Sequence, residues 1–524
     1  MWCPHPQPRG CGTIGPVTRP AAIAAPNTHA TEAARHALAS GGTAVDAAIA
    51  AMVTATVTEP GVVSTLGGCF VNVWADGSDP VVVDGNVEMP GRGMSEDVRG
   101  TGMIEAASDY GGGMVTYVGP GSVATPGMLA AMGWAHQRFG AAPWAELMQP
   151  AADVARAGYP LSRTAQSYLV LVTDTILAWD PATQALLTVD GGPPPVGHHV
   201  VDPVLADTLE HLGAQGAADA YRGDVARAID ADMRERGGLL SLADLEAYQP
   251  VVRTALRSRL GPWDLGCNPP PSIGGPVLTA LLRLLGATSG EIDPAQVALV
   301  MKDVLDIRLD RIDISEDLEA AGAELLQTLH RIGATGLPTS PSTAHVSVVD
   351  GDGMACALTA SAGYGSGMTI RGTGLVANNS LGELELNRLG LHALAPGTRL
   401  ASNMAPTTAR RDDGAVLAIG TPGADRITTA LAQVLTHMAR HGEDLQTAID
   451  RPRMHPRRLQ DGTTRIDHEE DAEIAESLDA AGLTRFEHAP SSMYFGGVGA
   501  ALRAPDGELT AAADDRRVAA TLVT

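Results

Sequence analysis

The sequence is short of aromatic residues, lysine and long apolar runs. Aromatic side chains make up 3% of the 524 residues, so the core must be packed from Ala, Val, Leu and Ile. Lys302 is the only lysine, which we interpret as a coding bias toward arginine. No stretch offers the ~18 uninterrupted apolar residues of a membrane-spanning helix. The segment from Met1 to Pro20 has neither the charged start nor the apolar run of a signal peptide, so we expect a cytoplasmic protein.

Basic residues are also scarce relative to acidic ones. The chain carries 60 Asp and Glu against 36 Lys and Arg, a formal charge of -24. This charge excludes a nucleic-acid backbone or an anionic membrane as the expected partner. A hydrophobic content of 44% with 18% charged residues is typical of a globular protein that buries a sizeable core.

Cysteines are few and do not form a pattern. They stand at positions 3, 11, 69, 267 and 356, an odd number widely spread, which favours reduced thiols over a disulfide framework. Cys3, His5 and Cys11 lie close together in the sequence, but no second cluster completes a set of four metal ligands. We expect neither a metal nor a cofactor.

One predicted strand follows a threonine that could act as a nucleophile. A Pro/Ser-rich loop ending at Pro341 leads to Thr343 and then to an alternating apolar strand that closes at Asp350-Gly351-Asp352-Gly353. Met354 to Thr359 is predicted as the return strand of a hairpin, with Thr343 at its open end. If the bond before Thr343 were cut, the hydroxyl would be a nucleophile and the freed α-amine, with a pKa of about 8, a built-in base. The alternative is a β-branched residue that merely opens a strand.

The first hundred residues predict a layered α/β fold. A short apolar strand at 21–25 precedes a helix at 31–38 and a second, buried helix that runs from Thr43 to a stop at Glu59-Pro60. Strands at 71–74 and 81–84 follow. This order indicates a helix pair that covers a sheet.

Two later segments bear on the domain organisation. Residues 84–121 are rich in Gly and Met and are predicted as long loops, which in a compact domain tend to be functional. Residues 290–337 are predicted to be mostly helical and end in the loop before Thr343. A domain boundary or a processing site is expected in that loop.

Together these landmarks resemble the gamma-glutamyltranspeptidase family, self-processing enzymes with an N-terminal threonine nucleophile. The similarity runs from about residue 20 to the C-terminus, and it depends on the order and spacing of the motifs. The motifs include Gly41 to Ala48, Glu59-Pro60, Leu66 to Phe70, Pro126-Gly127, Pro150-Ala151, Tyr221 to Gly223, Gly237 to Tyr248, Pro269 to Gly275, Thr343-Ala344-His345, Gly420 to Arg426 and Asp514 to Arg517.

The resemblance implies an N-terminal nucleophile hydrolase with a four-layer αββα sandwich. Cleavage before Thr343 would leave two fragments, residues 1–342 and 343–524. Residues 1–20 form an irregular segment, and 21–342 and 343–524 stay paired in one domain. The resemblance also implies that Ser361 stands where the family has a threonine that hydrogen-bonds the nucleophile. The backbone N–H groups of Gly423 and Ala424 match the family's oxyanion donors, and Ala424 in place of the second glycine is tolerable if its φ is negative.

The positions that recognise the substrate depart from the family. An arginine that grips the α-carboxylate of the glutamyl group is replaced by Asn86, and Arg92 or Arg99 could reach in from the following loop. The serine pair that helps to hold this carboxylate becomes Ser402-Asn403, after Ala401. The acyl group is therefore expected to differ from γ-glutamyl.

The amine-binding positions also differ. The resemblance places Gly363 where the family has an asparagine, Ser380 where it has a glutamate after the Asn378-Asn379 pair, and Glu383 where it has an aspartate. The lid segment between Glu383 and Ala401 is shorter than usual, and the resulting wider mouth predicts a substrate bulkier than glutathione. The expected substrate-binding residues are Asn86, Arg92, Asn379, Ser380, Glu383, Ser402 and Asn403.

Several residues have a simpler interpretation. His345 can be a packed strand histidine, Glu383 a solvated loop acid, and Ser402 and Asn403 residues outside the pocket. Gly363 to Gly367 resembles a phosphate loop, but no helix start follows it, which disfavours nucleotide binding.

We expect an amide hydrolase or acyltransferase that acts on a γ-glutamyl or related N-acyl compound, with water or an amine as acceptor and a place in glutathione metabolism. The alternatives are an amidohydrolase similar to the cephalosporin and glutaryl acylases, and an unprocessed homologue that only binds a ligand.

Overall fold

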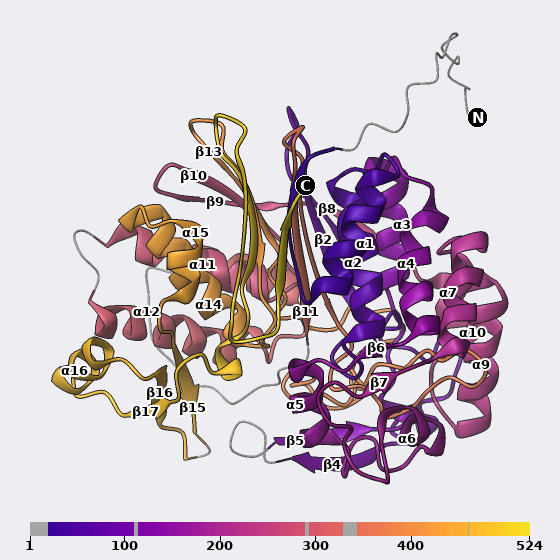
Figure 1. The fold of residues 1–524 in the computed structure, drawn as a ribbon. Coiled ribbons are helices and arrows are strands. Elements are labelled where there is room, and N and C mark those ends of the chain that lie inside the picture. The colour runs from indigo at the N-terminus through magenta and orange to yellow at the C-terminus, as the bar shows by residue number, and fades with distance from the viewer. Residues whose placement is uncertain (1–18, 109–113, 289–292, 329–342, 460) are drawn as a thin grey trace, which may run out of the picture.

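A computed structural model describes residues 19–108, 114–288, 293–328, 343–459 and 461–524. Two antiparallel sheets lie face to face at its centre (Figure 1). The seven-stranded sheet has the order β20 (Ala520–Val523), β1 (Ala21–Ala25), β11 (Ala344–Asp350), β12 (Ala355–Ser361), β2 (Gly68–Trp74), β3 (Val81–Gly85) and β8 (Val251–Thr254). The six-stranded sheet has the order β19 (Leu509–Ala513), β18 (Gly499–Arg503), β14 (Val416–Gly420), β13 (Thr407–Arg411), β10 (Trp263–Cys267) and β9 (Leu256–Leu260).

Small apolar side chains fill the space between the two sheets. The cluster includes Ala22 of β1, Ala357 of β12 and Ala418 of β14. Small residues at these positions let the sheets approach closely, in keeping with the scarcity of aromatic residues.

Helices from the first half of the chain lie on the outer side of the seven-stranded sheet, where the first three pack on its strands and the others pack farther out or beside two short pairs of strands (Figure 1). They are α1 (Thr28–Ala39), α2 (Ala44–Thr58), α3 (Met128–Phe139), α4 (Trp144–Ala157), α5 (Arg163–Val172), α6 (Pro181–Leu187), α7 (Pro203–Gln215), α8 (Asp219–Arg222), α9 (Asp224–Arg236) and α10 (Leu242–Ala247). Of these, α2 packs directly on β11 and β12, the strands that flank Thr343.

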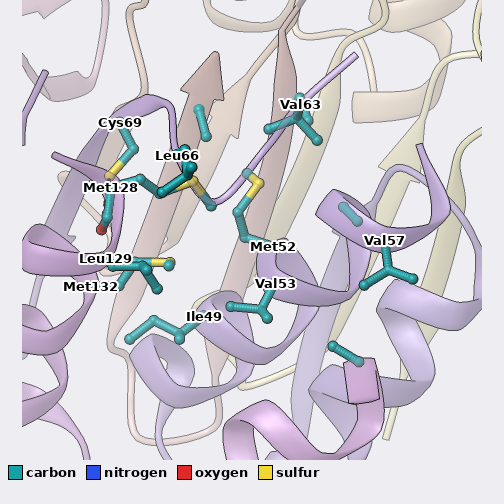
Figure 2. Close-up of a cluster of buried hydrophobic side chains, with 14 of the residues drawn as sticks. Ile49, Met52, Val53, Val57, Val63, Leu66, Cys69, Met128, Leu129 and Met132 are labelled. Carbon is teal, nitrogen blue, oxygen red and sulfur yellow. Dashed lines mark hydrogen bonds between the residues drawn. The ribbon is translucent and has the colours of Figure 1, made fainter. Parts of the chain in front are cut away.

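Helix α2 is buried on all sides because its sequence is apolar all round. A capping box fixes its start: the Thr43 hydroxyl accepts from the Val45 N–H at 3.2 Å, and the Asp46 carboxylate accepts from the Thr43 N–H at 2.9 Å. Figure 2 shows Ile49 of α2 near Leu129 and Met132 of α3, within the buried cluster to which all three belong. The predicted extent of this helix is confirmed.

Helices from the middle and end of the chain cover the six-stranded sheet. They are α11 (Gly274–Ala287), α12 (Pro294–Ile307), α13 (Leu318–Thr328), α14 (Arg426–Thr436), α15 (Leu445–Asp450) and α16 (Ala472–Ala480). A small sheet of β15 (Met454–Arg458), β16 (Thr464–Glu469) and β17 (Arg485–His488) packs beside them. The predicted mixed α/β fold is confirmed, and in the described ranges no helix is long and apolar enough to cross a membrane.

One predicted loop region is partly regular. Within residues 84–121 the strands β4 (Ile104–Ser108) and β5 (Met114–Val118) form an antiparallel pair. The prediction of long loops was wrong there. Each strand is five residues long, and the consecutive Ala106-Ala107 of β4 break its alternation of apolar and polar residues. A second short pair joins β6 (Tyr159–Pro160) to β7 (His199–Val200).

Candidate active site

Thr343 stands directly before β11, at the open end of the predicted hairpin. The β11–β12 register pairs Ala344 with Ala360, and its continuation by one residue places Thr343 opposite Ser361. Thr343 is 4% exposed. Antiparallel pairing therefore brings two hydroxyl side chains together although 18 positions separate them in the sequence.

A cavity of about 40 Å³ adjoins Thr343, and we call it the nucleophile pocket. The predicted site residues that line it are Asn86, Thr343, Ser361, Ser380, Glu383, Ser402, Asn403 and Ala424. They come from six separate segments of the chain. The fold thus gathers most of the residues that the motifs single out.

The turn after β14 supplies backbone donors to this pocket. Gly423 and Ala424 precede α14, with φ of 132° and 56°. Among the residues that the structure describes, no group accepts a hydrogen bond from either N–H. These donors lie beside the N-terminus of a buried eleven-residue helix, where the partial positive charge favours an anion.

The backbone of Ala424 does not meet the condition set from the sequence. Alanine was judged tolerable here if its φ is negative, but the angle of 56° lies in the left-handed region that side chains with a Cβ avoid. Such a residue stores on the order of 1 kcal/mol of strain.

A buried network anchors this turn. Asp425 contacts the Arg426 guanidinium at 2.8 Å and His455 Nε2 at 3.2 Å. Arg426 donates to the Tyr494 carbonyl at 3.0 Å and lies over the Tyr494 ring. The Gly420 to Arg426 motif therefore fixes the position of the two N–H groups.

Two buried carboxyl groups, Glu383 and Glu385, face the nucleophile pocket. Burial and the nearby Glu385 raise the pKa of Glu383 well above its usual range. Burial also raises the pKa of Glu385, while the Arg388 charge and the contact with the Tyr364 hydroxyl at 3.3 Å act in the opposite direction. The pair favours a shared proton or a bound cation.

Gly363 makes the space that Glu383 occupies. A Cβ at Gly363 would lie 2.7 Å from Glu383 Oε1 and 2.3 Å from Asn379 Oδ1. An asparagine at this position would collide with both side chains. The two departures at Gly363 and Glu383 are therefore one coupled change, and Glu385 is a functional candidate that the sequence reasoning missed. The alternation of Glu383 and Glu385, which places both on one side, could have signalled it.

Asn86 lines the pocket with its amide nitrogen already engaged. Its Nδ2 donates to the Leu400 carbonyl at 2.7 Å, and its own carbonyl accepts from the Tyr248 hydroxyl at 2.7 Å. Asn86 thus offers no cationic group for a carboxylate.

Arg399 is the buried cation nearest to Asn86, and sequence reasoning missed it. Its guanidinium donates to the Asn86 carbonyl at 2.9 Å and lies 3.1 Å from Glu88 and 3.6 Å from Asp84. It also stacks on the Tyr248 ring. Because two carboxylates balance its charge, Arg399 does not replace the missing arginine.

Some predicted binding residues do not line the pocket. Arg92 points to Glu88 at 3.4 Å and to Asp244 at 3.7 Å. Asn379 is a buried scaffold residue whose Oδ1 accepts from the Tyr364 N–H at 2.6 Å. Gly423 does not line the pocket, whereas the adjacent Ala424 does. The Arg92 and Asn379 side chains are therefore not part of the lining of the nucleophile pocket, and their contact with a substrate stays a prediction.

Ser402 and Asn403 do line the pocket, on the wall formed by residues 400–404. The Ser402 hydroxyl accepts from the Met404 N–H at 3.3 Å. Asn403 Oδ1 is buried and has no hydrogen-bond partner within the described residues. An unsatisfied buried acceptor of this kind points to a donor on a ligand.

A second cavity, which we call the rear pocket, adjoins the other side of Thr343. Glu59 lines it and accepts from Asn27 Nδ2 at 2.8 Å and from the Ser162 hydroxyl at 3.1 Å. Burial raises the pKa of Glu59 to about 7. Arg517, from the closing motif, lies in the same wall.

His345 forms part of the rear pocket wall. Its ring nitrogens contact the Thr359 hydroxyl at 2.8 Å and the Ser347 hydroxyl at 2.7 Å. Burial lowers the pKa of His345 to about 3, so the ring is neutral. The packed-histidine interpretation fits this geometry better than a general base.

The described residues offer little support for metal ligation. In these ranges, no three His, Cys, Asp or Glu side chains cluster in a way that could hold an ion. Cys69, Cys267 and Cys356 are buried free thiols. Cys3, His5 and Cys11 lie outside the described residues.

Comparisons with known proteins identify the relatives of the chain. The model of the family described as Gamma-glutamyltranspeptidase matches residues 30–299 and 291–524. The acylase ACY 1 proenzyme of Pseudomonas sp. (strain SE83) is 29% identical over 509 residues, which cover 91% of this chain and 88% of that protein. The glutathione hydrolase proenzyme of Pseudomonas aeruginosa is 29% identical over 504 residues, covering 88% of each.

A solved structure supports the fold. The cephalosporin acylase from Bacillus halodurans superposes with a TM-score of 0.79 at 23% identity, over 100% of this chain and 99% of that one. This likeness covers the whole architecture around Thr343.

Proposed function

Since the chain belongs to the gamma-glutamyltranspeptidase family, we propose that it cleaves the peptide bond before Thr343 and then uses the Thr343 hydroxyl on a small N-acyl amide. The enzyme class that the sequence predicts, a gamma-glutamyltransferase-like hydrolase or acyltransferase, is confirmed by this membership. Cleavage would leave fragments 1–342 and 343–524 paired across β1 and β11 in a four-layer αββα sandwich.

The observation that carries the proposal is the convergence of three groups on one cavity. Thr343 supplies a hydroxyl, Ser361 a second hydroxyl on the neighbouring strand, and the Ala424 turn supplies N–H donors. A nucleophile, a partner that orients it and an oxyanion site are the minimum set for acyl transfer.

The mechanism follows from these positions. Thr343 Oγ attacks the amide carbonyl carbon while its proton passes to the free α-amine of Thr343. The oxyanion that forms is stabilised by the N–H groups of Gly423 and Ala424, each worth on the order of 3 kcal/mol. The C–N bond then breaks, the leaving amine takes up the proton, and an acyl ester remains on Thr343. Water or an acceptor amine attacks this ester and restores the hydroxyl.

The walls of the pocket select the acyl group. A glutamyl α-carboxylate would meet Asn86, whose Nδ2 is engaged, and no cation. Glu383 offers a carboxyl group in the pocket that can ionise when an ammonium group replaces its proton. We therefore propose a compact acyl group that carries a cationic or hydrogen-bond-donating substituent and lacks the glutamyl carboxylate.

Loss of the arginine at position 86 also favours the second candidate, an amidohydrolase similar to the cephalosporin and glutaryl acylases. Sequence identity does not separate the two, because the acylase and the glutathione hydrolase relatives are each 29% identical. A non-catalytic homologue is the third candidate.

Mass spectrometry of the trapped acyl group tests the proposal. The protein is mixed with a panel of N-acyl 4-nitroanilides and glutathione, quenched with acid within the first turnover, and its fragments are weighed. A mass increase on the fragment that begins at Thr343 supports the proposal and identifies the acyl group. Ordinary efficiency with glutathione, and none with compact N-acyl compounds that carry an ammonium group and lack the glutamyl carboxylate, would contradict the proposed acyl preference.

A further inference from the structure

A third cavity, the outer cavity, opens next to the nucleophile pocket. Its volume is about 390 Å³, against about 40 Å³ for the nucleophile pocket. Leu386 and Ala401 line both cavities, so the two are neighbours across these side chains. A substrate whose carbonyl lies at Thr343 would extend past them into the larger space.

Arg388 lines the outer cavity. Its Nε donates to the Glu385 carbonyl at 3.1 Å, which fixes the guanidinium near the boundary between the two cavities. Its Nη2 is buried without a hydrogen-bond partner in the described part of the chain. Burial lowers the pKa of Arg388, while the nearby carboxylates of Asp313, Glu385 and Asp425 act in the opposite direction without a direct ion pair. A buried guanidinium nitrogen without an acceptor is costly, and an anionic ligand would offset that cost.

The other buried charges of the outer cavity are already balanced. Asp313 accepts from Arg308 Nε at 3.1 Å, and Arg399 lies 3.1 Å from Glu88. The remaining acids of the lining, Glu316, Asp317 and Glu319, are exposed, so water and salt screen them. Arg399 Nε also lacks a hydrogen-bond partner among the described residues, but its guanidinium has direct ion pairs with Glu88 and Asp84. Arg388 is therefore the arginine of this lining that has no direct ion pair within the described residues.

We infer that the outer cavity is a subsite for a carboxylate of the substrate, and that Arg388 binds this carboxylate. The inference rests on the proposed acyl transfer at Thr343. The size difference between the cavities places the carboxylate on the amine portion of the amide, since the nucleophile pocket holds the acyl portion. A carboxylate at the far end of the acyl portion has the same chemistry, and the probes below separate the two.

The test compares matched anilides of one acyl group. The 4-nitroanilide and the 3-carboxy-4-nitroanilide differ by one carboxylate on the amine portion, and a third probe carries a terminal carboxylate on the acyl chain instead. For the wild-type protein we expect kcat/KM to be at least tenfold higher for one carboxylate-bearing probe than for the neutral anilide, as for a charge-assisted hydrogen bond. The probe that shows this preference identifies the portion that enters the outer cavity.

Variants assign the preference to Arg388. Arg388→Met, which keeps the length of the side chain, should lower this preference ratio at least tenfold, and Arg388→Lys should retain part of it. Arg259→Met, which removes an exposed arginine of β9 that pairs with Asp412, is the matched control and should leave the ratio within twofold. An equal loss with all probes, or an unchanged ratio in Arg388→Met, overturns the inference.

A binding measurement separates this inference from the proposed function. Calorimetry measures the affinity of the wild-type protein for 5-amino-2-nitrobenzoate, the amine that the carboxylated probe would release. An affinity at least tenfold weaker in Arg388→Met supports the subsite even if no anilide is hydrolysed, an outcome that would reject the proposed function alone. Equal affinities in the two proteins, together with hydrolysis of the neutral anilide, reject the subsite alone.

Discussion

The two sides of Thr343 are built differently. On the rear side, Glu59 and His345 have their polar atoms satisfied by protein partners. In the nucleophile pocket, Asn403 Oδ1 has no partner among the described residues, and Glu383 stands beside a second carboxyl group. Protein folds satisfy buried polar groups unless another molecule does so.

This contrast separates support from recognition. The rear side holds the strand that carries the nucleophile, so changes there should alter stability and its pH dependence. The nucleophile pocket is incomplete without a ligand, so changes there should alter selectivity. Thr343 lines both pockets. Substitutions around it test whether changes in the rear pocket alter stability and changes in the nucleophile pocket alter selectivity.

The largest effect is expected at Thr343 itself. Thr343→Ala removes the hydroxyl that both self-cleavage and acyl transfer require, so we expect a single uncleaved chain and a loss of activity on the order of 1000-fold or more. Denaturing electrophoresis and anilide hydrolysis measure the two losses. Thr343→Ser, which keeps a hydroxyl, should be cleaved and retain partial activity. Cleavage or full activity in Thr343→Ala would remove Thr343 from its role.

Glu59 tests the supporting side through pH. The pKa of this carboxyl is raised to about 7, so the folded state binds its proton more tightly than the unfolded state. The free energy of unfolding therefore falls by about 3 kcal/mol as pH rises from the usual carboxyl range to 7, and changes no further above it. Glu59→Gln should lack this fall and be the more stable protein at pH 8.

Urea unfolding at pH 5 and pH 8 measures this difference, in the Thr343→Ala background so that one chain unfolds. Glu32→Gln, at an exposed position of α1, is the control and should change stability by less than about 0.5 kcal/mol. A Glu59→Gln variant with the wild-type dependence on pH would show that Glu59 does not titrate in this range.

Glu383 tests the recognition side. Glu383→Gln should lower kcat/KM about tenfold for substrates with an ammonium group on the acyl portion, because a charge-assisted contact is lost. Since the pKa of Glu383 is raised, wild-type kcat/KM for these substrates should rise with pH as the carboxyl group ionises, and the variant should lose this rise. Steady-state kinetics between pH 5 and 9 measure both. An equal loss of kcat/KM with substrates whose acyl portion lacks a cation would show that Glu383 maintains the structure of the site and does not recognise the substrate.

Ala424 gives the smallest expected effect. Ala424→Gly relieves the strain at a positive φ and keeps the N–H donor, so we expect a gain of about 1 kcal/mol in stability. Ala424→Val should lose at least as much, since a β-branched residue tolerates this backbone less well. Thermal unfolding of both variants in the Thr343→Ala background provides the measurement, and a destabilised glycine variant would contradict the backbone geometry.

The elements around Thr343 could be predicted because their signals are local. The alternation of β11, the Asp350 to Gly353 turn and the capping box of α2 each lie within a few residues of sequence. Motif spacing then indicated Ser361 and Ala424. The β4–β5 pair was missed because both strands are short and the alternation of β4 is broken at Ala106-Ala107.

The remaining parts of the site depend on contacts between distant segments. The coupling of Gly363 to Glu383 appears only when a Cβ is placed in the folded chain. The engagement of Asn86 by Leu400, and the balance of Arg399 by Glu88, join residues more than 300 positions apart. No periodicity or motif indicates such contacts, so the ion pairs of Arg92 with Glu88 and Asp244 could not be predicted from the sequence.

Self-cleavage before Thr343, which makes this threonine the first residue of a new chain, is the step on which every proposed activity depends. Intact mass and N-terminal sequencing of the purified wild-type protein after prolonged incubation measure it. We expect two fragments in equal amounts, one of which begins Thr-Ala-His-Val. A single chain of 53.9 kDa with no trace of that N-terminus would contradict the proposed mechanism.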